Sequence, residues 1–283
     1  MESSASLNEE EDTPTDEPLL DANTDQDEAA TSTPENVEEY TTTFVINIQR
    51  YAAIAAHVLA VAQIVVVYWW ISVLGGLSAW RPGHAKQVFN WHPLLMITAF
   101  CFMTVSSLSF KALPWRRNVK KLIHGSGWFV AAASAVVGLV AVFQSHNDGR
   151  SGYIANMYSL HSWIGMTVIV LYVTQFFVGV RAFGGAALAN ASWSAPWKRF
   201  VLQCHVVLGP LIYVLMGLTI LLGIQEKEGF VGCAYHVNSP DLFPLQHVAK
   251  IPAACLVSHL LGLLVFLTLI CTTIALAETR RFV

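Results

Sequence analysis

The sequence predicts an all-α membrane protein with six transmembrane helices. The chain is 54% hydrophobic and 12% charged, whereas about a quarter of the residues in an ordinary soluble domain carry charge. Its apolar residues are gathered in six long stretches, and a histidine lies near the start of four consecutive ones. These observations indicate a helical bundle in a lipid bilayer, with polar groups held at defined depths.

The N-terminal segment differs in composition from the rest of the chain. Positions 1–40 hold 14 of the 19 Asp and Glu residues and neither Lys nor Arg. A segment this acidic buries too little apolar surface to offset the entropy lost on ordering. We therefore expect residues 1–45 to form a disordered acidic cytosolic tail and residues 46–283 to form the transmembrane domain.

Each apolar stretch is long enough to cross a membrane. About 20 helical residues, at about 1.5 Å per residue, span the roughly 30 Å of hydrocarbon in a bilayer. Backbone polar groups in lipid must be satisfied within their own segment, so these stretches are expected to be helices. The predicted spans are 52–74, 90–110, 122–143, 160–180, 201–223 and 253–276.

The distribution of Lys and Arg predicts the direction of the spans. Cytosolic segments of membrane proteins carry an excess of basic residues, and this excess favours both termini in the cytosol. The cytosolic face would then hold 11 of the 16 basic residues, namely Arg50, Lys111, Arg116, Arg117, Lys120, Lys121, Arg181, Lys198, Arg199, Arg280 and Arg281.

The five cysteines follow no recognisable pairing pattern. Three lie within apolar spans, Cys255 begins the last span, and Cys233 lies in a polar loop. We therefore predict neither a disulfide framework nor a Cys-x-x-Cys metal site.

Four histidines fall into two pairs by depth. Because consecutive spans run in opposite directions, His92 and His161 lie near the outer side, and His124 and His205 lie near the cytosolic side. The two members of each pair stand on helices that face each other across a four-helix bundle, where side chains can grip a cofactor from both sides. This geometry fits a haem held by two imidazoles at each level.

Zinc and di-iron sites fit the four histidines less well than haem does. Such sites need several ligands at one level, often with carboxylates, and spans two to five contain neither Asp nor Glu. His57 and His259 lie toward opposite faces and cannot share one metal ion. The alternative hypothesis is a non-redox six-span transporter or scaffold, in which intramembrane histidines relay protons or fill helix contacts.

Four motifs connect these histidines to a known family. They are Phe89-Asn90-Trp91-His92-Pro93, Lys121-Leu122-Ile123-His124-Gly125, Tyr158-Ser159-Leu160-His161-Ser162-Trp163, and His205 with Gly209 four residues on. In these motifs and their order the chain resembles the cytochrome b561 family of ascorbate-dependent transmembrane oxidoreductases, from about Phe89 to about Glu226. Spans one and six match the family in hydropathy only.

The resemblance implies two haem b groups, an outer one ligated by His92 with His161 and a cytosolic one ligated by His124 with His205. It also implies cytosolic ascorbate as the electron donor, and monodehydroascorbate or a ferric chelate as the acceptor on the other side. A homodimer in membrane lipid is expected, and a nucleic-acid partner is not.

The resemblance assigns further residues to the two ends of the bundle. Ascorbate is an anion, and basic residues precede both cytosolic ligands, where they can form charge-assisted hydrogen bonds to it. We expect Lys111 near a propionate of the inner haem. The remaining expected site residues are Arg117, Lys120, Lys121, Lys198 and Arg199 for ascorbate, His146 and Asn147 for the outer acceptor, and Asn156, Tyr158 and Glu226 beside the outer haem.

The acidic tail also carries a candidate sorting signal. The segment Asp16-Glu17-Pro18-Leu19-Leu20 resembles an acidic dileucine motif. It favours an endosomal, lysosomal or secretory-vesicle membrane, with the plasma membrane as the alternative.

Overall fold

The computed structural model of the chain describes residues 34–184, 194–230, 233 and 252–277, and throughout these residues the regular structure is helical. The chain divides into two compact units, Met1–Thr43 and Phe44–Val283. The candidate sorting signal lies outside the described residues.

Within the described residues, six helices are long and apolar enough to cross a membrane, which confirms the predicted fold class. Most of these helices are longer than the predicted spans, because polar and basic residues beyond the apolar stretches are also helical. A short helix, α2, precedes the second span and was not predicted. The helices are α1 (Pro34–Val73), α2 (Ala85–Phe89), α3 (Trp91–Ala112), α4 (Arg117–His146), α5 (Leu160–Phe183), α6 (Ala195–Phe230) and α8 (Ala253–Leu276).

The start of α1 differs from the prediction for the acidic tail. Residues 34–45 were expected to be disordered but are helical. Proline is well suited to the first position of a helix, and acidic side chains interact favourably with the positive end of the helix dipole. Disorder of residues 1–33 stays a prediction, since they lie outside the described part.

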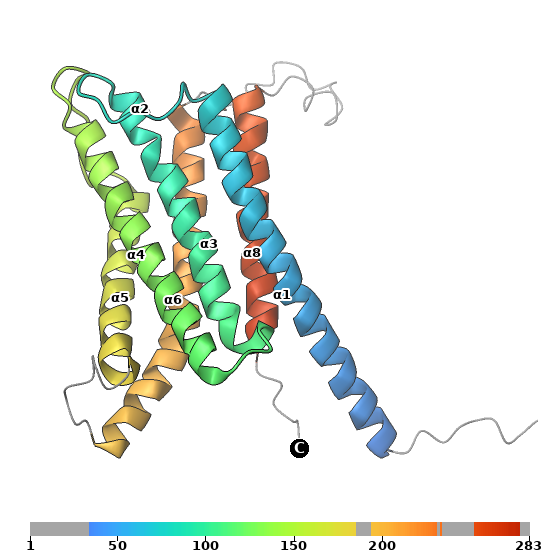
Figure 1. Ribbon diagram of the computed structural model, residues 1–283. Helices are drawn as coiled ribbons and strands as arrows, with labels where there is room; N and C mark the ends of the chain where they lie inside the picture. The colour runs from blue at the N-terminus through green and yellow to red at the C-terminus, as the bar shows by residue number, and fades with distance from the viewer. Residues whose placement is uncertain (1–33, 185–193, 231–232, 234–251, 278–283) are drawn as a thin grey trace, which may run out of the picture. The chain divides into compact units, whose positions relative to one another are not determined.

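The helices pack as antiparallel neighbours. Helix α3 lies against α4, α5 lies against α6, and α6 lies against α8. Helix α1 is held to α8 by the buried amide of Gln63, whose Nε2 donates to Thr268 Oγ1 at 2.6 Å. Nearer the start of the unit, Gln49 Nε2 donates to the carbonyl of Ala277 at 2.6 Å. Helices α1 and α8 therefore flank one side of the bundle (Figure 1).

A polar bridge and a ring stack lie in the buried core between α3, α6 and α8. The hydroxyl of Tyr213 lies 2.8 Å from Thr104 Oγ1 and 3.0 Å from Thr272 Oγ1. The Tyr213 ring stacks on Phe100 with centroids 5.0 Å apart. Hydrogen bonds between helices supplement packing in lipid, where the hydrophobic effect does not drive helices together.

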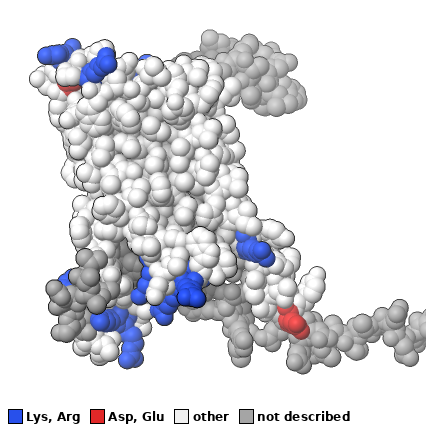
Figure 2. Space-filling model, in the orientation of Figure 1, with Lys and Arg blue, Asp and Glu red and all other residues white. Residues whose placement is uncertain are grey.

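Charged side chains are confined to the two ends of the bundle. Figure 2 shows a broad uncharged band between them. One end, which we call the basic end, is formed by the end of α3, the start of α4, the end of α5 and the start of α6. From Phe44 onward the described acidic residues are Asp148, Glu226 and Glu228, and all three lie at the opposite end. This separation is typical of a membrane protein with the basic end in the cytosol.

One prediction from the cysteines is wrong. Cys233 and Cys255 form a disulfide. The two residues follow α6 and begin α8, and because these helices are antiparallel neighbours, their ends meet at the end opposite the basic one. The sequence showed only a loop cysteine and a span cysteine 22 residues apart, without the packing that joins them.

Replacing Tyr213 with Phe should lower the stability of the bundle. The change keeps the ring stack but removes the hydroxyl that joins two threonines on neighbouring helices, and such interhelical hydrogen bonds contribute about 0.6 to 1.7 kcal/mol. Thermal unfolding in detergent micelles should show a lower midpoint for Tyr213→Phe. The matched control, Tyr68→Phe, removes an exposed hydroxyl from α1 and should leave the midpoint unchanged; an equal loss in both variants would contradict the bridging role.

Candidate functional site

Two pairs of histidines lie inside the bundle, one toward each end. The first histidine pair is His92, at the start of α3, with His161, at the start of α5; their ring centroids are 6.2 Å apart. The second histidine pair is His124, near the start of α4, with His205 of α6; their ring centroids are 6.1 Å apart. The structure brings together the same partners that the alternating direction of the spans predicts.

Three of the four imidazoles are oriented by a backbone carbonyl of a neighbouring helix. The Nδ1 atom of His92 donates to Gly138 O at 3.1 Å, that of His124 donates to Ser106 O at 2.9 Å, and that of His161 donates to Thr219 O at 3.0 Å. Because a carbonyl can only accept, Nδ1 carries the proton. The Nε2 atom then keeps its lone pair, as is typical of metal-ligating histidines.

The fourth imidazole has a different environment. His205 Nδ1 is buried and has no hydrogen-bond partner within the described residues. Its backbone carbonyl instead accepts a hydrogen bond from Gln175 Nε2 of α5 at 2.9 Å. Helix α6 also contains Pro210 one turn further on, which cannot donate to the helical ladder and disturbs the turn before it.

Small residues on the neighbouring helix leave room for two of the rings. A Cβ atom at Gly223 would lie 2.7 Å from His161 Cε1, and one at Gly179 would lie 3.2 Å from His205 Cε1. The first distance is impossible without moving the ring. Gly223 is therefore required by the position of His161, a role that its place in the sequence does not reveal.

Aromatic side chains surround the second pair. The rings of Phe110 and Trp128 lie 5.3 Å and 6.1 Å from that of His124, and Phe183 lies 5.9 Å from His205. These contacts shield the imidazoles from water and restrict their rotation.

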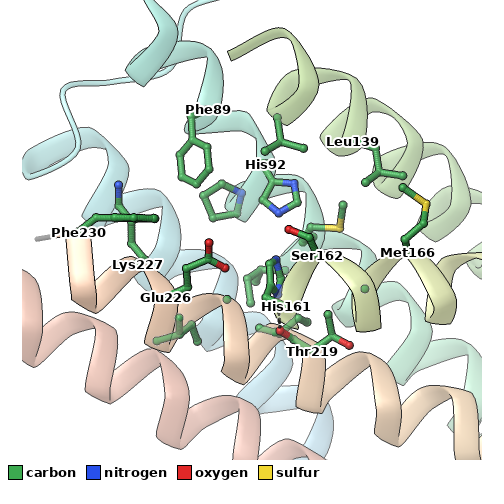
Figure 3. A pocket seen from close by; sticks show the side chains of 18 of the residues that line it. Phe89, His92, Leu139, His161, Ser162, Met166, Thr219, Glu226, Lys227 and Phe230 are labelled. Atoms are coloured by element: carbon green, nitrogen blue, oxygen red, sulfur yellow. Dashed lines mark hydrogen bonds between the residues drawn. The ribbon is translucent and has the colours of Figure 1, made fainter. Parts of the chain in front are cut away.

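A large cavity opens beside the first pair, at the end opposite the basic one. In Figure 3, His92 and His161 face the space from two helices, Leu139 and Met166 lie to one side, and Phe89 lies to the other. The walls are mostly apolar, but Tyr158, Glu226 and His146 also line them. Such a combination of apolar walls and a few converging polar groups is typical of a cofactor or substrate site.

The carboxylate of Glu226 is held in a fixed position at this cavity. Its Oε1 accepts from the Tyr158 hydroxyl at 2.5 Å, and its Oε2 accepts from Ser159 Oγ at 2.9 Å. Burial and the hydrogen bond to Glu226 raise the pKa of Tyr158 to about 12. Tyr158 therefore keeps its proton at physiological pH and serves as a donor.

A second set of polar side chains, formed by His146, Asn147 and Asn156, lies next to the set around Glu226. Asn156 accepts from His146 through Oδ1 at 3.2 Å and donates to Asn147 Oδ1 at 3.0 Å. The chain reaches the cavity wall through Met157, whose φ of 56° lies in the left-handed region that side chains rarely adopt. Strained backbone of this kind is concentrated at functional sites. The predicted outer residues His146, Asn147, Asn156, Tyr158 and Glu226 thus form one connected region.

The predicted cytosolic residues all lie at the basic end. Lys111 Nζ donates to the carbonyls of Leu276 and Ala277 at 2.7 Å each, and so caps the end of α8. Lys120 Nζ donates to Phe110 O at 3.1 Å. Lys111 is exposed, as are Arg117, Lys121, Lys198 and Arg199, whereas Lys120 is half-buried.

Together the fold and the site define a polytopic helical membrane protein with two pairs of facing imidazoles, one toward each end of the bundle. The sequence profile of eukaryotic cytochrome b561 matches residues 91–231, which contain all four histidines. The chain is also similar to three curated proteins whose names state a redox activity.

The transmembrane ascorbate ferrireductase 1 of Arabidopsis thaliana is 39% identical over 180 residues, which are 62% of this chain and 71% of the relative. The plasma membrane ascorbate-dependent reductase of Rattus norvegicus is 36% identical over 185 residues, 63% of this chain and 60% of the relative. The lysosomal membrane ascorbate-dependent ferrireductase of Homo sapiens is 36% identical over 178 residues, 58% of this chain and 65% of the relative. The chain thus spans less than two thirds of the two mammalian proteins.

The chain belongs to the eukaryotic cytochrome b561 family. It is therefore a multi-pass transmembrane oxidoreductase, as the sequence resemblance predicted.

The family implies haem b, and the residues present fit this group. Imidazole nitrogens bind metal ions at about 2 Å, so two rings on opposite sides of one ion have centroids roughly 6 Å apart, close to the separation in both pairs. The described residues contain no group of three or more His, Cys, Asp or Glu that could hold a metal ion. Two neutral nitrogen ligands at each level suit a porphyrin, which supplies the remaining four.

Gly223→Ala should displace His161 and reduce haem b binding. The added Cβ would overlap the ring at 2.7 Å, whereas alanine favours helix over glycine by about 1 kcal/mol, so a loss cannot be blamed on helix propensity. We expect a smaller b-type absorbance per milligram of purified protein. Gly229→Ala, on the same helix with open space at the new Cβ, should keep the full absorbance. Equal absorbance in both variants would show that the His161 ring can move aside without loss of haem binding.

Proposed function

We propose that the protein binds two haem b groups, one at each histidine pair, and carries electrons from cytosolic ascorbate to an acceptor on the other side of the membrane. The observation that supports this most is the presence of two imidazole pairs with nearly equal separations at opposite ends of one bundle. His92 with His161 would hold the outer haem, and His124 with His205 the inner one.

The basic end is proposed to face the cytosol. The concentration of Lys and Arg there supports this orientation. The disulfide between Cys233 and Cys255 supports it independently, because it lies at the opposite end and disulfides persist in oxidising compartments rather than in the cytosol. Both termini would then be cytosolic.

The donor site is proposed to lie at the starts of α4 and α6. Ascorbate carries a negative charge and several oxygens, and it needs cationic hydrogen-bond donors near the inner pair. Lys121 lies one turn before His124, and Arg199 lies two turns before His205. From Phe44 onward, no described acidic residue lies at this end to neutralise them.

In this proposal, the haem and the protein residues have separate roles. When bound, haem b accepts and passes on one electron at a time, which is chemistry that amino-acid side chains lack. The cationic residues at the basic end bind and orient the donor. The backbone carbonyls hold the imidazoles, and the buried residues between the two pairs, among them Phe100, Met103 and Tyr213, exclude water.

The acceptor site is proposed at the polar wall of the cavity, around His146, Asn147, Asn156, Tyr158 and Glu226. A ferric chelate and monodehydroascorbate are both compatible with this wall. The names of the Arabidopsis and human relatives, both ferrireductases, favour ferric iron.

The cellular location and assembly are proposed from the names of the relatives, the tail sequence and the family resemblance. The relatives act at plasma and lysosomal membranes by name, and the dileucine segment favours an endosomal, lysosomal or related vesicle. A homodimer is proposed on the family resemblance alone.

Removing a ligand should remove one haem signal at a time. His92→Ala and His161→Ala should each abolish the outer haem signal, while the inner haem still accepts electrons from ascorbate. Absorption and electron paramagnetic resonance spectra of the purified variants measure both. If His92→Ala instead removed the signal that His124→Ala removes, the assignment of partners would be refuted.

Neutralising the basic end should slow reduction without changing haem content. Lys121→Gln or Arg199→Gln removes a cationic donor, so stopped-flow reduction by ascorbate should slow by about 10-fold or more, the effect expected when one hydrogen bond to a charged group is lost. Arg50→Gln removes the same charge from α1 and should have little effect. A parallel fall in haem content and rate would indicate a structural role instead.

A further inference from the structure

One cation at the outer cavity has no role in the function proposed above. Lys227 of α6 follows Glu226 and lines the same cavity. Its ammonium lies 5.0 Å from the centre of the Phe89 ring and 5.9 Å from that of Trp70. Figure 3 shows Lys227 and Phe89 on one side of the cavity, with Phe89 next to His92. The ring centroids of Phe89 and His92 are 6.0 Å apart.

Both carboxylates adjacent in sequence are engaged elsewhere. Glu226 accepts from Tyr158 and Ser159. Glu228 accepts from Ser258 Oγ at 2.7 Å and pairs with His259 Nε2 at 3.3 Å. Within the described residues, Lys227 therefore has no ion pair with either neighbouring carboxylate.

The aromatic rings hold the ammonium in place but do not neutralise it. A ring face attracts a cation by roughly 0.5 to 2 kcal/mol, depending on desolvation, and accepts none of the three strong hydrogen bonds that an ammonium can donate. A partly buried cation without a counter-ion is unfavourable. An anion that enters the cavity would relieve this cost and gain a charge-assisted hydrogen bond.

We propose that Lys227 is the residue that recruits acceptors carrying free carboxylates, such as a ferric chelate of a polycarboxylic acid. This proposal rests on the proposed function of the outer cavity and adds its charge selectivity. Lys227 binds the carboxylate of the chelate, and the ferric ion gains one electron to become ferrous; the lysine itself forms and breaks no bond. Without Lys227 the carboxylate of Glu226 would leave this wall acidic and repel such an acceptor.

Two electron acceptors of opposite charge distinguish recruitment of anionic acceptors by Lys227 from a general effect of this residue on electron transfer. The purified holoprotein is reduced with dithionite and mixed in a stopped-flow instrument with ferric citrate, an anion, or with hexaammineruthenium(III), a cation. Lys227→Gln should raise the KM for ferric citrate by about 10-fold or more, the effect of losing one hydrogen bond to a charged group, and leave oxidation by the ruthenium complex unchanged or faster. Lys227→Arg should preserve the wild-type KM. Arg81→Gln, which removes an exposed cation from the same end, should also behave as wild type.

A second measurement does not depend on turnover. Iron-free citrate should raise the thermal midpoint of the wild-type protein, because a ligand stabilises the state that binds it, and this rise should be lost in Lys227→Gln. Equal slowing with both acceptors, or the same effect in Arg81→Gln, would overturn the proposal. A changed midpoint potential of the outer haem would overturn it too, because Lys227 would then serve a carboxylate of the haem.

These outcomes are distinct from failure of the proposed function. If ascorbate did not reduce the wild-type protein, the proposal that ascorbate is the donor would be refuted. Reduction by dithionite and binding of citrate would still test the role of Lys227.

Discussion

The hydrogen bond from an imidazole Nδ1 to a backbone carbonyl of the adjacent antiparallel helix is the constraint on which the rest of the site depends. His92 lies across from Gly138, and His124 lies across from Ser106. The spacing between the two histidines equals the spacing between the two acceptors, so one register of α3 against α4 orients an imidazole at each end. The bond fixes the tautomer and leaves the lone pair on Nε2. A shift of one residue in this register would misplace both imidazoles.

The second helix pair repeats this arrangement only in part. His161 lies across from Thr219, and the same register places His205 across from Gln175. There the glutamine side chain binds the backbone carbonyl of His205, and Nδ1 has no partner in the described residues. Pro210 disturbs the helical ladder within the same stretch. Among the four imidazoles, His205 is thus the one whose Nδ1 has no hydrogen-bond partner in the described residues, and it stands at the end where the donor is proposed to bind.

Much of the fold and part of the site could be predicted from the sequence. Long apolar stretches identify spans because lipid offers the backbone no other partner, and the alternation of direction pairs His92 with His161 and His124 with His205. The start of α1 at Pro34 was missed, because a compositional argument for disorder ignores local helix initiation. The disulfide of Cys233 was missed because its loop carries no periodic signal.

Other features depend on packing that a single sequence does not contain. Gly223 looks like any small residue in a membrane helix until the His161 ring is placed against it. Lys227 looks like an ordinary charge at a helix end, where basic side chains commonly reach for the interface. Its significance emerges only when Glu226 is found bound to Tyr158, and when Phe89 and Trp70 are found around the ammonium.

The two ends of the bundle are electrostatically different (Figure 2). In the proposed function, exposed Lys and Arg without described acidic neighbours suit an anionic donor, whereas the wall of the outer cavity combines Glu226, His146 and Lys227. Both proposals require one haem at each end. The ratio of haem b to protein, measured on the purified wild-type chain by its absorbance in alkaline pyridine, tests this most directly. We predict two haem b groups per chain, both reducible by ascorbate; a single haem, or none, would contradict the proposed function.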